Sequence, residues 1–323
     1  MNNKKNIFLL LSIILLAAGI IFLGRGYIQK GLPEAFSKLN TQSLDTEKIK
    51  VTVSFYPLAY FAGEVGGDKV SVKNLTPLGT EPHDFEPSLR DLASLEKSDL
   101  FIYNGASFEP WVSRWLQTQA ISSSHANQSI NMVSRIGEKE DLLYQNNNID
   151  PHIWLDPIIA QKEVVFIRDV LVIIDPLHKE EYRLNAENLI RKIASLDEYF
   201  KETLNSCALR DIIVAHNAFG YFARRYNLSM TPIAGISPDE EPSPKEIIRI
   251  ISLAHEKGIR HIFFETIANP KFAETIAREI GGGLLVLNPI ESLTHEEAQS
   301  GKDYLSLMTE NLYNLKTALV CNQ

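Results

Sequence analysis

The sequence predicts an α/β protein built from two lobes that one long helix joins. From Lys50 onward, short apolar runs alternate with stretches of helical period, which is typical of a parallel sheet covered by helices. This alternation occurs twice. Between the two series, one apolar face continues from Leu177 to Ser206, which at about 1.5 Å per residue gives a helix of roughly 40 Å. A helix of that length can act as a stiff connection between lobes, although an ordinary surface helix within one domain is the alternative.

The first lobe is predicted to span residues 49–176. We expect strands over 49–55, 69–77 and 100–105, and helices over 57–67, 88–99, 108–119 and 157–174. The helix over 88–99 is expected to place Leu89, Leu92 and Leu95 on one side, and Trp111 and Trp115 are four residues apart, as in core packing. The polar residues 121–148 are interpreted as a surface loop that includes His125, with one short strand near 131–134.

The second lobe is predicted to span residues 207–323, after the joining helix over 177–206. We expect strands over 211–216, 229–235, 259–266 and 283–289, and helices over 217–227, 242–258, 269–281 and 301–319. The joining helix has no Gly, and no Pro after its first turn, so it offers no obvious hinge.

The N-terminus carries a targeting or anchoring signal over residues 1–24, followed by a polar linker over 25–48. Lys4 and Lys5 precede an uncharged apolar run from Ile7 to Leu23, which is just long enough to cross a bilayer. We favour a retained anchor over a cleaved signal peptide, because the run is long for a signal peptide and no clear cleavage site follows it. Both interpretations place the remaining chain outside the cytoplasm, tethered to the membrane in the first case and free in the second.

Composition limits the function classes. The net charge of −8 argues against nucleic acid as a partner, because phosphate binding needs a basic face. Cys207 and Cys321 are the only cysteines; they are compatible with a disulfide, but their distance cannot be known from sequence. Neither has a nearby Cys or His, so a metal role for them is not expected.

Four residues are candidate metal ligands: His83, His152, His216 and Glu291. Three of them follow apolar runs that read as strands, and His152 precedes a helix; ligands of open α/β sheets bind beyond the carboxyl ends of strands. Two candidates come from each lobe, so we expect one site in the cleft between lobes. Neutral imidazoles with one carboxylate suit Zn²⁺. Taken singly, each His could instead be a solvated or packed side chain.

Other polar residues are weaker candidates. Asn288 is neutral, and Glu265 ends a neighbouring predicted strand where it would support a ligand rather than bind metal. The remaining histidines are interpreted as solvated; they are His178, His255, His261 and His295.

Several long phrases resemble the zinc and manganese substrate-binding proteins of ABC transporters, the TroA-like group. They are EPHDFEPS, DPHIWLDP, HNAFGYFARRY, EPSPKE and GKDYLSLMTENL, in order between Lys50 and Leu319. The resemblance implies two (β/α)4 lobes joined by one rigid helix, with the metal between them. It also implies that His83, His152, His216 and Glu291 are the ligands. The long His-rich loop of many zinc members is missing, since residues 121–148 hold one His.

Two classes of function follow. The first is a monomeric carrier, not an enzyme, that captures Zn²⁺ outside the cytoplasm and delivers it to an ABC permease; Mn²⁺ is the less favoured metal. The alternative is a zinc hydrolase that uses Glu291 as general base, but the H-E-x-x-H signature is absent. A surface adhesin would share the fold, and the sequence does not separate it from a carrier.

Overall fold

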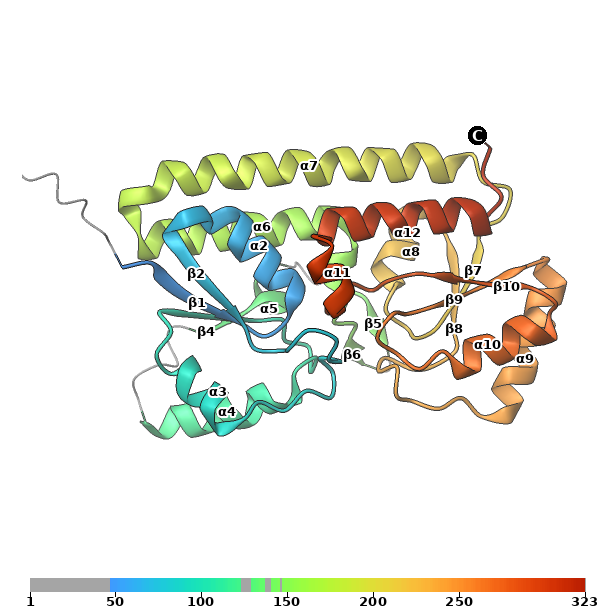
Figure 1. Cartoon of the computed structure of the whole chain (residues 1–323), viewed down its shortest axis with the longest axis horizontal. Coiled ribbons are helices and arrows are strands. Elements are labelled where there is room, and N and C mark those ends of the chain that lie inside the picture. Colours follow the sequence, from blue (N-terminus) through green and yellow to red (C-terminus); the bar gives the residue numbers. More distant parts are fainter. Residues whose placement is uncertain (1–46, 123–128, 137–140, 146, 323) are drawn as a thin grey trace, which may run out of the picture. The chain divides into compact units, whose positions relative to one another are not determined.

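A four-stranded parallel sheet and two pairs of parallel strands lie side by side under one long helix in the computed structural model (Figure 1). The structure describes residues 47–122, 129–136, 141–145 and 147–322, and those from Lys48 on form one compact unit. The predicted anchor, the predicted linker up to residue 46, and His125 lie outside the described residues. Among the residues described, no helix is both long and apolar enough to span a membrane.

The N-terminal sheet has four parallel strands in the order β2-β1-β3-β4. Its strands are β1 (Ile49–Val53), β2 (Val70–Asn74), β3 (Leu100–Tyr103) and β4 (Ser129–Asn131). The helices of this half are α2 (Tyr56–Gly66), α3 (Leu89–Leu95), α4 (Pro110–Ser122), α5 (Met132–Ile136) and α6 (Pro157–Ile174). Short 3-10 turns η1 (Gly67–Lys69), η3 (Ile153–Leu155) and η4 (Pro176–His178) connect them.

The C-terminal strands form two parallel pairs, β7–β8 and β9–β10, with β7 next to β9. Their bounds are β7 (Asp211–Val214), β8 (Ser229–Pro232), β9 (His261–Phe264) and β10 (Gly283–Val286). The helices are α8 (Gly220–Tyr226), α9 (Pro244–Lys257), α10 (Lys271–Glu279), α11 (His295–Gln299) and α12 (Tyr304–Ala318). The alternation of parallel strands and helices in both halves confirms the predicted fold class.

The joining helix is α7 (Lys179–Asn205), two residues shorter at its start and one at its end than expected. It packs against α2 and α6 of the N-terminal half and against α8 and α12 of the C-terminal half, as Figure 1 shows. The predicted face is buried throughout; it consists of Tyr182, Ala186, Leu189, Ile193, Leu196, Phe200 and Leu204. The division into lobes at residues 176 and 207 stays a prediction.

A disulfide links Cys207, just after α7, to Cys321, just after α12. The sequence left this pairing open. The bond ties the last segment of the chain to the end of the joining helix, across 114 residues of sequence.

Three local predictions were wrong. Residues 121–148 are not only loop, since they contain β4, α5 and a two-strand hairpin of β5 (Tyr144–Gln145) and β6 (Asn148–Ile149). The strand expected at 131–134 ends at Asn131, whose side chain accepts a hydrogen bond from the Ser134 amide at 3.0 Å and so starts α5. Leu89 is 85% exposed rather than facing the core with Leu95.

The helix α11 was also not predicted, although its start has a recognisable signal. Thr294 and Glu297 form a capping box, in which each side chain bonds to the other's backbone amide. The Trp prediction is confirmed, because Trp111 and Trp115 are buried in a cluster with Phe101 and Leu95.

Candidate metal centre

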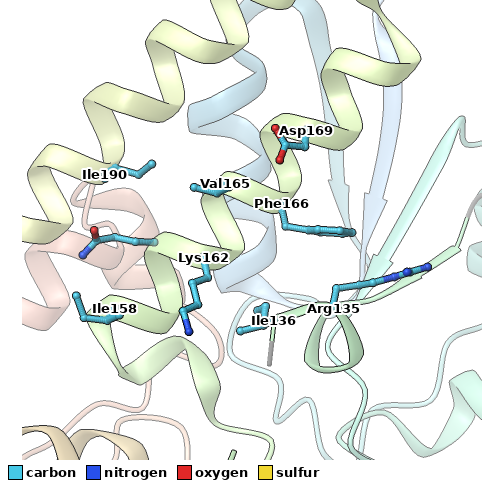
Figure 2. A pocket seen from close by; sticks show the side chains of 9 residues that line it. Arg135, Ile136, Ile158, Lys162, Val165, Phe166, Asp169 and Ile190 are labelled. Atoms are coloured by element: carbon cyan, nitrogen blue, oxygen red, sulfur yellow. The ribbon is translucent and has the colours of Figure 1, made fainter. Parts of the chain in front are cut away.

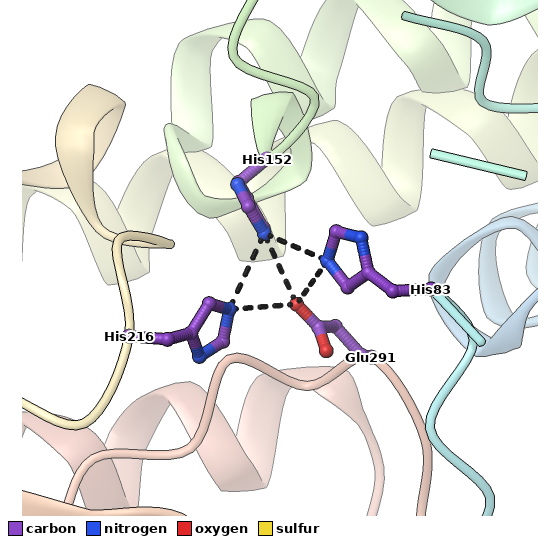
Figure 3. A group of neighbouring side chains, drawn as sticks. All are labelled: His83, His152, His216 and Glu291. Carbon is purple, nitrogen blue, oxygen red and sulfur yellow. Dashed lines mark hydrogen bonds and ion pairs between the residues drawn. The ribbon is translucent and has the colours of Figure 1, made fainter. Parts of the chain in front are cut away.

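The four predicted ligand residues converge on one point between the two sheets (Figure 3). His83 lies in the loop after β2, and His152 immediately precedes η3. His216 follows β7 by two residues, and Glu291 lies in the loop after β10. One donor atom from each lies within 4.8 Å of the other three, and all four side chains are buried.

The distances between donor atoms are short. The Nε2 atom of His152 lies 3.3 Å from that of His83 and 3.4 Å from that of His216. The Oε1 atom of Glu291 lies 3.2 Å from His152 Nε2, 3.4 Å from His216 Nε2 and 3.7 Å from His83 Nε2. Four donors about 2.0 to 2.1 Å from a tetrahedral Zn²⁺ would lie about 3.3 to 3.4 Å from one another. These five spacings, 3.2 to 3.7 Å, are close to those of a tetrahedral site, and the remaining pair of donors lies within 4.8 Å.

Two carboxylates orient the imidazoles. Asp150 Oδ1 lies 2.7 Å from His152 Nδ1, and Glu265 Oε1 lies 2.6 Å from His216 Nδ1. A proton on each Nδ1 completes these hydrogen bonds and leaves each Nε2 lone pair directed at the common point. Glu265 therefore has the supporting position that the sequence suggested.

The charges and the burial of the four side chains favour a positive charge between them. Burial opposes a charge on His216 and His152, but the carboxylates of Glu265, Asp150 and Glu291 outweigh it and raise the pKa of both rings. The pKa of His83 is lowered, mainly by burial. Burial also opposes charge on Glu291, yet hydrogen bonds from the three imidazoles hold the pKa of this carboxyl well below its usual range. Either a proton or a metal ion between these side chains supplies that positive charge.

Both oxygens of Glu291 are buried and, among the described residues, accept no hydrogen bond from a backbone amide; besides the ring nitrogens, the carboxyl of Glu81 interacts with this carboxylate. A buried carboxylate without ordinary donors is costly unless a cation pairs with it. The residues present therefore fit a cation, and the mixture of imidazole and carboxylate fits zinc.

The Glu291 loop is shaped by residues outside the cluster. Asn288 Oδ1 accepts a hydrogen bond from the Ile290 amide at 2.8 Å, and Ile290 has a left-handed backbone with φ of 60°. This conformation is unfavourable for a β-branched residue, so the surrounding bonds must hold it. Trp154 Nε1 donates to the Pro289 carbonyl at 2.7 Å, which ties the His152 segment to the same loop. Asn288 is thus a loop-shaping residue, outside the group of converging donors.

Sequence reasoning missed two neighbours of the site. Glu81 is two residues before His83, and burial together with the Glu291 charge raises the pKa of Glu81 to about 10, so this carboxyl stays protonated. The Phe108 ring packs against His83 at 4.5 Å between ring centroids. The phrase EPH signalled Glu81, but nothing local signalled Phe108.

The other histidines are not part of the centre. His255 and His295 are exposed, as predicted. His178 is instead half-buried with its Nδ1 near Asp175 Oδ2, and His261 is half-buried on β9. These two predictions of full solvation were wrong, because packing at a helix junction and between strands covers the rings.

A surface groove away from the metal centre is lined by none of the four ligand candidates (Figure 2). It is lined mainly by α6, including Ile158, Lys162 and Phe166, and has a volume of about 400 Å³. Lys162 is paired there with Asp141. The groove offers no converging donors and is not a metal site.

Both the fold and the site define a two-lobed metal-binding protein. The model of the family described as zinc-uptake complex component A, periplasmic, matches residues 51–318, and the chain belongs to this family. Members are substrate-binding proteins of ABC transporters rather than enzymes, which confirms the class predicted from sequence.

Individual relatives agree with this membership. The chain is 37% identical over 284 residues to the high-affinity zinc uptake system protein ZnuA of Bacillus subtilis, covering 85% of this chain and 88% of that protein. It is 35% identical to the zinc-binding lipoprotein AdcA of Streptococcus pneumoniae, covering 83% of this chain but only 55% of AdcA. The solved structure of a laminin-binding protein of Streptococcus agalactiae, described as bifunctional with adhesin and metal transporting activity, is also similar. It is 29% identical with a TM-score of 0.73, and the match covers 84% of this chain and 100% of that chain.

Proposed function

We propose that this protein captures Zn²⁺ outside the cytoplasm and delivers it to an ABC permease for uptake. The observation that carries the proposal is the convergence of three imidazole nitrogens and one carboxylate oxygen, at spacings of 3.2 to 3.7 Å, on a buried point. His83, His152, His216 and Glu291 bind the ion, and Asp150 and Glu265 hold two of the imidazoles in the binding tautomer. Zinc is the cargo, so no reaction is required.

Binding rather than hydrolysis agrees with the closed ligand set. A catalytic zinc has three protein ligands and an open position for water, whereas four protein ligands close the tetrahedron. With Glu291 in the shell, the hydrolase alternative loses its general base. Family membership also does not favour a hydrolase.

Zinc is preferred over Mn²⁺ in this proposal. Manganese favours shells rich in oxygen and six ligands, and the order of divalent affinities places it below zinc for sites of this kind. Three nitrogens and one oxygen at tetrahedral spacing fit zinc better.

The surroundings of the protein are also part of the proposal. We infer that the apolar run from Ile7 to Leu23 anchors the chain in the cytoplasmic membrane and that residues 48–323 work on the outer side, as a monomer without nucleic-acid partners. Relatives with lipoprotein or periplasmic descriptions support an extracytoplasmic position.

A competition titration tests the function and the ligand set together. The metal-free protein is titrated with Zn²⁺ and with Mn²⁺ against a chromophoric chelator, for the wild type and for Glu291→Ala, with Glu296→Ala on the exposed face of α11 as a matched control. We expect one tightly bound zinc per chain, weaker manganese, and a large loss only for Glu291→Ala. Equal or tighter manganese binding would reject the metal assignment, and unchanged zinc affinity in Glu291→Ala would remove this residue from the shell.

A further inference from the structure

The turn between α6 and α7 exposes three large aliphatic side chains. Ile173 is 78% exposed, Ile174 is 40% exposed and Leu177 is 83% exposed. We call these three residues the apolar tip. Such a cluster on five consecutive positions has no role in the buried core, since the core face of α6 ends at Leu171.

The turn has a fixed shape that holds the apolar tip outward. Asp175 Oδ2 accepts a hydrogen bond from the Tyr182 hydroxyl at 2.7 Å and lies 2.5 Å from His178 Nδ1. Tyr182 is itself fully buried on α7. These bonds help to fix the turn, and in this conformation the three aliphatic side chains are exposed.

The chain enters the described unit at this same end. Ile49, the first residue of β1, pairs with Val70, which directly follows η1. Lys69 of η1 lies 3.7 Å from Glu181 in the first turn of α7. Figure 1 shows β1 starting beside the α6–α7 turn. The preceding sequence, which contains the apolar run over residues 7–23, therefore joins the domain next to the apolar tip.

A lysine-lined groove lies over β1 and β2 of the N-terminal sheet, beside the carboxyl end of α3, and includes Lys50 next to the entry of the chain. It has a volume of about 250 Å³, and Lys50, Lys73 and Lys97 line it together with serine hydroxyls. Lys50 is the second residue of β1, and its carbonyl accepts from the Asp99 amide just before β3. Lys73 is partly neutralised by Asp91 at 3.3 Å. Ammonium and hydroxyl groups of this kind suit the phosphates of lipid headgroups.

We propose that this end of the N-terminal half, the apolar tip with the lysine-lined groove, rests on the phospholipid surface of the membrane. The inference depends on the anchoring proposed above. The anchor keeps the domain next to the membrane and so raises the effective concentration of lipid at this surface. A small surface that would bind lipid weakly on its own is then occupied. Aliphatic side chains enter the boundary between headgroups and acyl chains, and lysines lie at the phosphates. The metal cleft is at the opposite, carboxyl ends of the strands and stays clear of lipid.

The test uses the full chain in phosphatidylcholine nanodiscs that contain nitroxide lipids labelled in the headgroup region. A polarity-sensitive fluorophore is attached at Leu177→Cys, and at Ile248→Cys on α9 as control, because Ile248 is an equally aliphatic side chain that is 66% exposed. Cys207 and Cys321 are disulfide-bonded and do not take the label. We expect several-fold stronger quenching at position 177 than at 248, and a fall to the control level when Ile173→Asn and Ile174→Asn are added.

Other outcomes overturn the inference. Equal quenching at the two positions in protein that is bound to the nanodiscs rejects lipid contact while leaving anchoring intact. Cross-linking of position 177 to a second copy or to residues 7–23, without quenching, assigns the apolar tip to that occupant instead. A chain that does not bind the nanodiscs at all rejects both the anchor and this contact, whereas the zinc titration stands independently.

Discussion

Replacing Glu265 by Gln tests how far the site depends on residues that do not touch the metal. Glu265 Oε1 lies 2.6 Å from His216 Nδ1, and both side chains are almost completely buried. The substitution keeps the size of the side chain but removes the negative charge. An amide oxygen can still accept the Nδ1 proton, so we expect the fold and the ring orientation to persist.

The expected loss of zinc affinity is about 10- to 100-fold, the range typical of residues that orient a ligand histidine. This corresponds to about 1.4 to 2.7 kcal/mol of binding free energy. The carboxylate makes the His216 ring more basic and stabilises the positive charge that zinc brings, and the neutral amide does neither.

The loss should depend on pH in a definite direction. In the metal-free protein, Glu265 raises the pKa of His216 well above its ordinary value, against the effect of burial. Zinc must displace that proton, and the Glu265→Gln variant holds it less tightly. As the pH falls, proton competition therefore weakens the wild type more than the variant, and the difference between their affinities narrows.

The measurement is a chelator competition at about pH 6 and about pH 8, with Glu163→Gln as the control. Glu163 is equally buried but accepts no hydrogen bond from the described residues and touches no ligand candidate. Unchanged affinity in Glu265→Gln, or an equal loss in the control, would refute the reasoning. A loss that grows toward low pH would refute its electrostatic part.

Three further predictions concern stability and motion. Glu163→Met should stabilise the protein by about 1 to 3 kcal/mol, because a buried carboxyl without partners is costly. Burial raises the pKa of Glu163 well above 4.5, so the folded state holds the proton more tightly than the unfolded state. The free energy of unfolding of the wild type therefore falls above about pH 4.5, by up to about 1.4 kcal/mol per pH unit. Urea unfolding at several pH values should show a flatter pH dependence of this free energy for the variant. Replacing Cys207 and Cys321 by Ser should cost about 2 to 5 kcal/mol, since the bond closes a loop of 114 residues, and a loss below 1 kcal/mol in thermal unfolding would contradict this. Zinc removal should cause local shifts of the His83 and His152 loops rather than a wide opening, because α7 has no internal Gly or Pro, and small-angle scattering that shows a wide opening would reject it.

Much of the fold was predictable because it depends on local patterns. The period of apolar residues located α6 with its observed bounds and α7 to within two residues, since a helix buries every third or fourth side chain. Where hydrogen bonds from polar side chains determine the backbone conformation, the pattern of apolar residues predicted the structure less well. Asn131 starts α5 and Thr294 starts α11 through side-chain hydrogen bonds, and both short helices escaped prediction.

The sequence by itself determined which residues are the ligand candidates, because each stands at the end of a predicted strand or the start of a helix within a distinctive phrase. It could not determine their distances, since residues 83 and 291 are brought within 3.7 Å only by the packing of two sheets under α7. The burial that makes Glu81 a protonated neighbour of Glu291, the Cys207–Cys321 bond, and the position of the apolar tip beside the entry of the chain were likewise decided by tertiary structure. A sequence pattern depends only on the neighbours of a residue along the chain. These features depend instead on contacts between segments that are 100 or more residues apart, or on surfaces that form when such segments meet.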